Sequence, residues 1–384
     1  MDLSIRLLMI LPLFLLLAAC SGKPRTFSAP NEEHYIDANV IGYQNIRQWG
    51  DRTSDEIYHN AKHLRSNGSL HKRADILALS SGGEDGAYGA GFLEGWSARG
   101  DRPEFFMVTG VSTGALIAPF AFLGSGYDHV LKDLFTETAK ENIITETPLN
   151  ALFGGSSIGD NTPLRKRLEK VVTDELVAAI AKEGKKGRIL QIGTTNLDAQ
   201  RPVVWNITNI AQSGRPDARK LILDIMLASS SIPGTFPPML IDVVIEGKRY
   251  QEVHVDGAVT RQIFVYPRDM NIPKLEKKLG VHPKKKFWLI RNTKIDPEYA
   301  PVSLNVTDIS DRSISTLIKY QGVCNLYNII SLAKRDGFDI HITNIPSDFR
   351  MPAKEAYDRE YMRALYKVGY ERGRSGTAWH YSLK

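Results

Sequence analysis

The chain has 384 residues, of which 42% are hydrophobic and 24% are charged, a composition typical of a globular protein that buries a sizeable core. The formal net charge is +6, from 49 basic and 43 acidic residues, and the basic residues are spread out apart from short clusters such as 284–286. This small excess excludes a dedicated nucleic-acid binder and fits a mild attraction to anionic lipid surfaces.

The first twenty residues, MDLSIRLLMILPLFLLLAAC, have the pattern of a secretion signal. A short polar start precedes an apolar run at 7–19 that matches a signal-peptide core and is too short to span a bilayer. The final LAAC resembles the lipobox of bacterial lipoproteins, in which the cysteine is acylated and becomes the first residue of the mature chain. We therefore expect Cys20 to be a lipid anchor, with Ser21 after it favouring the outer membrane of the cell envelope. A soluble secreted protein is the alternative.

Composition divides the rest of the chain. The stretch SGKPRTFSAPNEEH has the Ser, Pro and Gly content of a tether, and regular structure is expected from about residue 38. The expected parts are a signal peptide at 1–19, a tether at 20–37, an N-terminal extension at 38–73, a catalytic domain at 74–268, and a C-terminal part at 269–384 that packs on the same domain.

From residue 75 onward, short apolar or β-branched runs alternate with longer helical patterns. Strands are expected at 75–79 and 105–109 and in GRILQIGTTNL, PVVWNIT, IDVVIEG, YQEVHVDG, KKFWLIRN and FDIHITNI, and helices in GAYGAGFLEGWSA, GALIAPFAFLG and DARKLILDIMLASSS. This alternation predicts an α/β fold, a mostly parallel sheet covered by helices on both faces. The last amphipathic segment, KEAYDREYMRALYKVGYERGRS, is expected to be a helix docked on the sheet, with a membrane-lying helix as the alternative.

The segment LALSSGGEDGAYGAGFLEGW reads as a strand, a glycine-rich turn and a helix. Gly82 and Gly83 can present bare amides to a ligand because no side chain blocks the approach, which suits an oxyanion hole. A nucleotide-binding loop is the alternative, but the segment has no Gly-Lys-Ser/Thr and lacks the order of glycines of the dinucleotide fingerprint.

The pentapeptide Gly110-Val111-Ser112-Thr113-Gly114 lies between an expected strand and an expected helix, where it resembles a nucleophile elbow. The following helix would aim its N-terminal amides at the negative charge that develops during acyl transfer. The pattern alone is weak, because it recurs at 155–159. There it follows no clear strand and leads into a loop before a helix, so turn chemistry explains Ser157 and leaves Ser112 as the nucleophile candidate.

The segment QEVHVDGAV ends a strand with Asp256-Gly257-Ala258. A carboxylate at a strand end can accept the serine proton directly if its surroundings make it basic enough. His254 would point to the same side of a regular strand, which leaves a triad of Ser112, His254 and Asp256 open. His254 and Asp256 would lie side by side on one face of the strand, whereas a triad needs the imidazole between the serine and the carboxylate. We therefore favour a Ser112–Asp256 dyad.

Other reactive side chains have simpler interpretations. Asp85 is placed to cap the next helix, and Asp198 lies in a strand-to-turn segment. If Cys20 is acylated, Cys324 has no disulfide partner, and it reads as a small buried apolar residue in a helix. The nine histidines show no metal-ligand spacing. No metal or cofactor is expected.

The glycine-rich turn, the Gly-x-Ser-x-Gly elbow and the Asp-Gly-Ala motif, in this order, resemble the patatin-like phospholipase family over roughly residues 74–268. The stretches TTNLDAQRPVVW, IMLASSSIPGTFPP and SSIGDNTPLR are similar to it as well. The resemblance implies a three-layer α/β/α fold, a Ser-Asp dyad, hydrolysis of ester-linked acyl chains and no metal in the chemistry. It also implies that four glycines support the motifs: Gly86, Gly110, Gly114 and Gly257.

The turn departs from the family pattern. Ser81 stands where the family usually has the first glycine, and Glu84 and Asp85 occupy the place of a basic residue. The backbone donors are retained, whereas the charge of the headgroup pocket is altered. The sequence thus predicts a membrane-tethered serine hydrolase of lipid acyl esters; the alternative is a catalytically silent lipoprotein that binds lipid or organises a partner.

Overall fold

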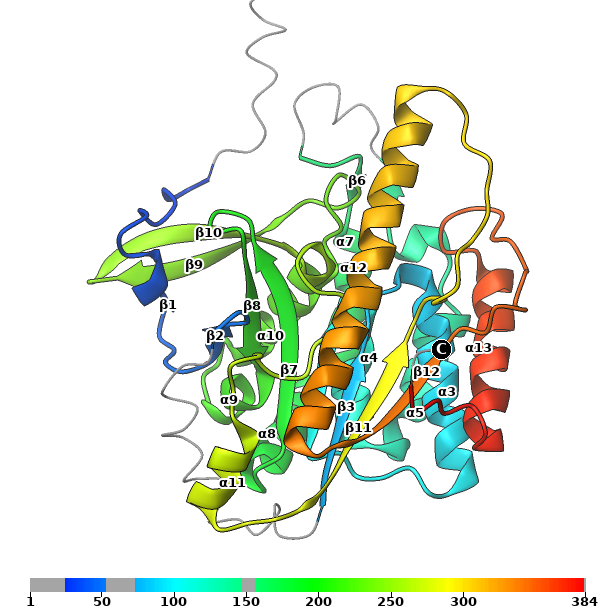
Figure 1. Cartoon of the computed structure of the whole chain (residues 1–384). Helices are drawn as coiled ribbons and strands as arrows, with labels where there is room; N and C mark the ends of the chain where they lie inside the picture. Colours follow the sequence, from blue (N-terminus) through cyan, green and yellow to red (C-terminus); the bar gives the residue numbers. More distant parts are fainter. Residues whose placement is uncertain (1–24, 53–72, 147–155, 383–384) are drawn as a thin grey trace, which may run out of the picture.

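The computed structural model describes residues 25–52, 73–146 and 156–382. Its centre is a parallel five-stranded sheet segment in the order β7, β4, β3, β11, β12 (Figure 1). Apolar, β-branched runs form these strands, which are buried on both faces as parallel strands usually are. Their bounds are Ile189–Asn196, Met107–Val111, Arg73–Leu79, Lys284–Arg291 and Asp339–Asn344.

An antiparallel extension continues the sheet beyond β7. The order runs through β10, β9 and β1, while β8 pairs with the other edge of β7 and β2 pairs with β8. Strands β9 and β10 form a hairpin whose two connecting residues, Glu246 and Gly247, both have positive φ. The extension comprises β10 (Lys248–Asp256), β9 (Met239–Ile245), β1 (Asn39–Val40), β8 (Arg201–Asn206) and β2 (Arg47–Trp49).

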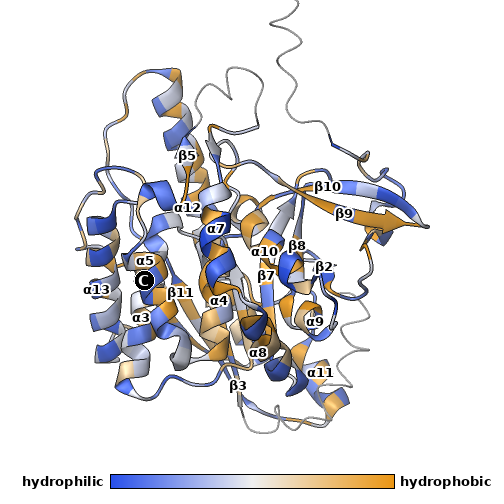
Figure 2. Cartoon of the chain, turned by 180° about the vertical axis from the view of Figure 1, so that it is seen from behind, coloured by the Kyte–Doolittle hydropathy of each residue, from blue (hydrophilic) through white to orange (hydrophobic). Residues whose placement is uncertain are grey.

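Helices cover both faces of the sheet, which confirms the predicted three-layer α/β/α fold with a mostly parallel central sheet. One face carries α12 (Val306–Asp336), and the other carries a larger group that includes α4 (Figures 1 and 2). Helix α4 (Thr113–Leu123) is apolar nearly all round and is buried accordingly. The remaining helices are α3 (Gly86–Arg99), α5 (Asp128–Thr136), α7 (Thr162–Val171), α8 (Asp174–Lys185), α9 (Ile207–Gln212), α10 (Ala218–Ser229), α11 (Ile272–Leu279) and α13 (Arg359–Ser375).

The last helix, α13, packs on α3 and α5 and not on the sheet, which corrects the expectation for this segment. The two backbones of α3 and α13 cross closely at glycines. A Cβ on Gly91 would lie 2.0 Å from the carbonyl oxygen of Tyr366, and one on Gly373 would lie 2.2 Å from that of Phe92. Periodic glycines on both helices therefore decide where the amphipathic C-terminal helix docks.

The start of the described chain is attached to the body. Thr26 and Phe27 donate backbone hydrogen bonds to the Gln251 side chain, and Arg25 pairs with Asp198. The expected signal peptide and Cys20 lie outside the described residues. Within the described part of the chain, no helix is long and apolar enough to cross a membrane. Cys324 is exposed on α12, so the prediction that it is buried is wrong: its position faces away from the side of α12 that contacts the sheet.

Candidate active site

Strand register brings Ser112 and Asp256 together. On one edge of β7, Gly193 pairs with Val111 of β4, and the next residue, Thr194, pairs with Asp256 at the end of β10. Strand β4 thus ends where β10 arrives, and Ser112 is the first residue after β4. Two segments 144 positions apart therefore meet at the carboxyl edge of the parallel strands, the edge where open α/β sheets place their sites.

Ser112 has the strained backbone of a nucleophile elbow, with φ 55° and ψ −125°. A non-glycine residue in this region carries a strain of roughly 1–3 kcal/mol that the surroundings must hold in place. The flanking glycines allow this close turn. A Cβ on Gly114 would lie 2.4 Å from the carbonyl oxygen of Leu79, and one on Gly110 would lie 2.3 Å from that of Gly114.

The Ser112 hydroxyl donates a hydrogen bond to Oδ2 of Asp256 at 2.6 Å, while Oδ1 accepts one from the backbone N–H of Ala258 at 2.8 Å. Asp256 is buried, and burial raises its pKa to about 7, although the hydrogen bonds from Ser112 and Ala258 lower it in part. A carboxylate that titrates near neutral pH is well matched to accept a hydroxyl proton.

A brace around the elbow was missed at the sequence level. The hydroxyl of Ser229, at the end of α10, accepts from the Ser112 backbone N–H at 2.9 Å and donates to the Gly193 carbonyl at 2.7 Å. In the sequence, the run of three serines in LASSS marks only the end of an expected helix and part of the family resemblance. Nearby, a Cβ on Gly257 would lie 2.5 Å from the same Gly193 carbonyl, so glycine lets the turn after Asp256 approach β7.

The turn at Gly82 and Gly83 faces the elbow. Gly82 packs on Asn292, whose carbonyl oxygen would lie 2.3 Å from an added Cβ, whereas the corresponding side of Gly83, with φ +58°, is open. Neither amide donates a hydrogen bond to any other described residue. Gly86 allows the start of α3 to approach α4, since its Cβ would lie 2.1 Å from Oγ1 of Thr113. Two helix N-termini thus converge near Ser112, where they favour negative charge.

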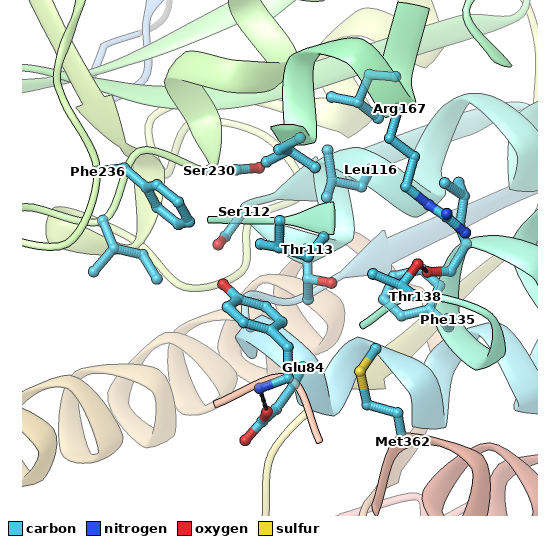
Figure 3. A pocket seen from close by; sticks show the side chains of 17 residues that line it. Glu84, Ser112, Thr113, Leu116, Phe135, Thr138, Arg167, Ser230, Phe236 and Met362 are labelled. Carbon is cyan, nitrogen blue, oxygen red and sulfur yellow. Dashed lines mark hydrogen bonds between the residues drawn. The ribbon is translucent and has the colours of Figure 1, made fainter. Parts of the chain in front are cut away.

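An apolar cavity of about 50 Å³ opens at Ser112. In Figure 3 the Ser112 side chain lies between Phe236 and Leu116, with Met362 further along the cavity. The cavity exposes few polar atoms. The buried Thr113 hydroxyl has no hydrogen-bond partner among the described residues. The other lining residues are Gly83, Glu84, Leu134, Phe135, Thr138, Ile143, Leu164, Arg167, Leu168, Ser230, Ile232 and Tyr357.

The two acidic residues of the turn bind the C-terminal segment. Glu84 accepts a hydrogen bond from the backbone N–H of Tyr357, and Oδ1 of Asp85 accepts one from the Tyr361 hydroxyl at 2.5 Å. The prediction that Asp85 caps α3 is therefore wrong, because its side chain makes no capping bond and turns to Tyr361. Burial raises the pKa of Glu84 and that of Asp85, the latter to about 7.

His254 is fully buried and bonded elsewhere. Its Nδ1 lies 3.0 Å from Oγ1 of Thr194, and its Nε2 lies 3.0 Å from the carboxylate of Glu252, which also pairs with Arg47. Burial lowers the pKa of His254, against the raising effect of Glu252. Both ring nitrogens are thus occupied by groups other than Ser112 and Asp256.

The remaining candidates have structural contacts. The Ser157 hydroxyl donates to the carbonyl of Gly159, and Asp198 accepts from the Val253 N–H. Among the described residues, no group of three or more His, Cys, Asp or Glu side chains could hold a metal ion.

Residues 77–267 match the family model of the patatin-like phospholipases. Among solved structures, the crystal structure of VipD from Legionella pneumophila matches with 12% sequence identity and a TM-score of 0.35. That match covers 80% of this chain and 66% of VipD. No curated protein matches the sequence. The chain thus carries a patatin-like phospholipase domain at residues 77–267.

Proposed function

We propose that the protein is a serine hydrolase of ester-linked lipid acyl chains that works through a Ser112–Asp256 dyad. The observation that carries this proposal is the 2.6 Å hydrogen bond from the hydroxyl of a strained elbow serine to a buried carboxylate. No other described side chain bonds to this hydroxyl, so Asp256 is the group positioned to take its proton.

In the acylation step, Ser112 Oγ attacks the ester carbonyl carbon and its proton passes to Asp256. The amides of Gly82 and Gly83, with the N-terminus of α4, stabilise the oxyanion of the tetrahedral intermediate. When the intermediate collapses, the bond to the alcohol oxygen breaks and that oxygen takes the proton from Asp256. In deacylation, Asp256 accepts a proton from water, the resulting hydroxide attacks the acyl-enzyme, and Ser112 regains its proton as the fatty acid leaves.

The lining of the cavity favours an acyl chain over a polar group. Leu116, Phe236 and Met362 are apolar, and the family match supports lipid acyl hydrolysis in general. The volume of about 50 Å³ is small for a chain of many methylenes, so we expect a long acyl chain to widen the cavity on binding. We further propose that acylated Cys20 anchors the mature protein in the bacterial envelope, at the outer membrane.

Labelling with a fluorophosphonate probe tests the dyad against the alternative of a catalytically silent lipid-binding protein. We expect covalent labelling of the full chain, with complete loss in Ser112→Ala. Ser157→Ala is the matched control, because Ser157 occupies the same pentapeptide pattern and bonds within its own turn. Absence of labelling in well-folded wild-type protein would favour the binding protein, and loss in Ser157→Ala alone would identify the other serine.

A further inference from the structure

The first half of α12 and the loop before it expose large apolar side chains. Leu304 is 96% exposed, Val306 83% and Leu317 71%. Soluble monomers rarely gather so many apolar groups on one exposed surface unless the surface binds something. We call its outward-facing part the α12 patch; the members are Tyr299, Val302, Leu304, Val306, Ile309, Leu317 and Tyr320.

The patch lies on the outer face of an amphipathic half-helix. At about 100° per residue, Val306, Ile309, Leu317 and Tyr320 fall within about 80° of one another. Charged residues take the opposite face and turn inward: Lys319 and Arg312 bond to the preceding loop at Glu298, and Lys319 also bonds to Asp296. Arg312 and Lys319 are thus held by the protein, and the apolar stripe is left to the outside.

The second half of α12 is arranged the other way round. Leu326, Ile329 and Leu332 are buried against the sheet, as the inner stripe of a surface helix should be. On the helical wheel this buried stripe lies about 160° from the exposed stripe of the first half. Ile314 and Ile318, which are also exposed, continue this buried stripe, whereas the helical residues of the patch face away from the side on which the helix packs.

The patch lies on the same side of the molecule as the candidate active site. The first half of α12 rises beyond the carboxyl end of β11, the edge of the sheet where Ser112 follows β4 (Figure 1). Arg25 lies at this edge too, because it pairs with Asp198 just after β7. Cys20 is five residues before Arg25, so an anchor there reaches at most about 17 Å from this edge.

We propose that the α12 patch docks on a lipid bilayer and holds the active-site edge against it. The inference rests on the proposed lipid substrate and anchor, and it adds a second membrane contact that the anchor does not supply. An anchor at Cys20 alone would let the body rotate about it, whereas an anchor and an apolar tip at one edge fix which edge faces the lipid. Burial of the apolar patch among acyl chains makes the free energy of membrane binding favourable, as for interfacial amphipathic helices.

Depth-dependent fluorescence quenching tests this docking without relying on catalysis. The mature full chain carries Cys324→Ser and one new cysteine, Leu317→Cys, labelled with an environment-sensitive dye and reconstituted in phosphatidylethanolamine–phosphatidylglycerol vesicles. Ser315→Cys is the matched control, because Ser315 is exposed on the charged face of the same turn. We expect spin-labelled lipid to quench the dye at 317 and to leave the dye at 315 unquenched. A dye at 317 that stays in water overturns the proposal. So does a change at 317 that appears without vesicles as the protein dimerises, since a second copy would then cover the patch.

An activity comparison separates this inference from the proposed function. Val306→Asp with Leu317→Asp should lower hydrolysis of vesicle phospholipid by about tenfold or more while leaving a soluble short-chain ester unaffected, because only the first substrate requires docking. Ser315→Asp should change neither rate. Equal phospholipid rates in all variants would reject the docking surface alone. A wild-type protein inactive on the soluble ester would reject the proposed hydrolase, whatever the quenching result.

Discussion

The backbone N–H of Tyr357 donates a hydrogen bond to the carboxylate of Glu84, a residue 273 positions earlier in the glycine-rich turn. Tyr357 itself adopts φ +58°, an uncommon conformation for a bulky residue, and its side chain lines the cavity at Ser112. The acidic pair that departs from the family pattern thus fixes the C-terminal segment over the active site. This contact makes Tyr357 part of the wall that limits the size of the cavity.

Tyr357→Ala should therefore shift chain-length preference. Removing the phenol ring enlarges a cavity of only about 50 Å³, so kcat/KM for a long-chain p-nitrophenyl ester should rise relative to a four-carbon ester, by about tenfold. Tyr381→Ala is the control, because Tyr381 is exposed and does not line the cavity. An unchanged ratio between the two esters would remove Tyr357 from the acyl-binding wall.

Local chemistry explains which parts of the site could be predicted from the sequence. The elbow and the Asp-Gly-Ala turn depend on glycines next to the functional residue, so short motifs carry the signal. The bracing of Ser112 by Ser229 and the capture of Tyr357 by Glu84 depend on long-range contacts, which no local pattern encodes. The same holds for α13, whose glycines match those of α3 only once both helices have formed.

The sheet, like the site, was predicted only in part from the sequence. Alternating strands and helices gave the parallel centre, where each strand needs a helical crossover. The antiparallel hairpin of β9 and β10 was not singled out, although its two-residue connection Glu246-Gly247 is a hairpin signal. A glutamate in the first turn position made that signal weaker than Asn-Gly or Asp-Gly. This omission matters for the site, because the second strand of the hairpin ends at Asp256 and positions it beside Ser112.

The pH dependence of activity should follow Asp256. Because the base must be ionised and burial raises its pKa to about 7, kcat/KM for a soluble ester should rise with pH and reach half of its plateau near pH 7. The measurement is a pH–rate profile on an uncharged ester at constant ionic strength. A plateau that extends unchanged down to pH 5 would show that the base titrates near the ordinary carboxyl value.

Stability should respond to pH in the opposite direction. The pKa of Asp256 rises from 3.8 to about 7 on folding, so the folded state binds a proton more tightly, and stability falls as pH rises between these values. Asp256→Asn removes the buried charge and keeps the shape. Its Tm should exceed that of the wild type at pH 8, and the difference should vanish near pH 4. Asp85 titrates in the same sense but is present in both proteins, so the comparison isolates Asp256.

Cys20→Ser should separate the protein from the membrane. If the anchor is lipid on this sulfur, the variant should accumulate as an unprocessed precursor or appear in the soluble periplasmic fraction. Fractionation with and without detergent, followed by mass spectrometry of the N-terminus, provides the measurement. Cys324→Ser is the control, because it removes the other cysteine of the chain and should leave fractionation unchanged. A processed Cys20→Ser protein that stays membrane-bound would contradict the anchor.

The choice between a dyad and a triad depends on His254. Since its two nitrogens bond to Thr194 and Glu252, His254→Ala should keep at least about a tenth of wild-type turnover, whereas Asp256→Asn should lose nearly all of it. The same His254→Ala change should cost stability, by about 2–4 kcal/mol, because it opens a buried cavity and removes a hydrogen-bond partner of Glu252, which keeps its ion pair with Arg47.

Turnover measured on both purified variants, with thermal unfolding of each, decides the matter. We expect the two variants to differ in what they lose. His254→Ala should lose stability and keep turnover, whereas Asp256→Asn should lose turnover and keep its fold. Near-complete loss of turnover in a stably folded His254→Ala would reject the dyad. The imidazole would then have to leave Thr194 and Glu252 and move between Ser112 and Asp256, a rearrangement that the direct 2.6 Å hydrogen bond makes unnecessary.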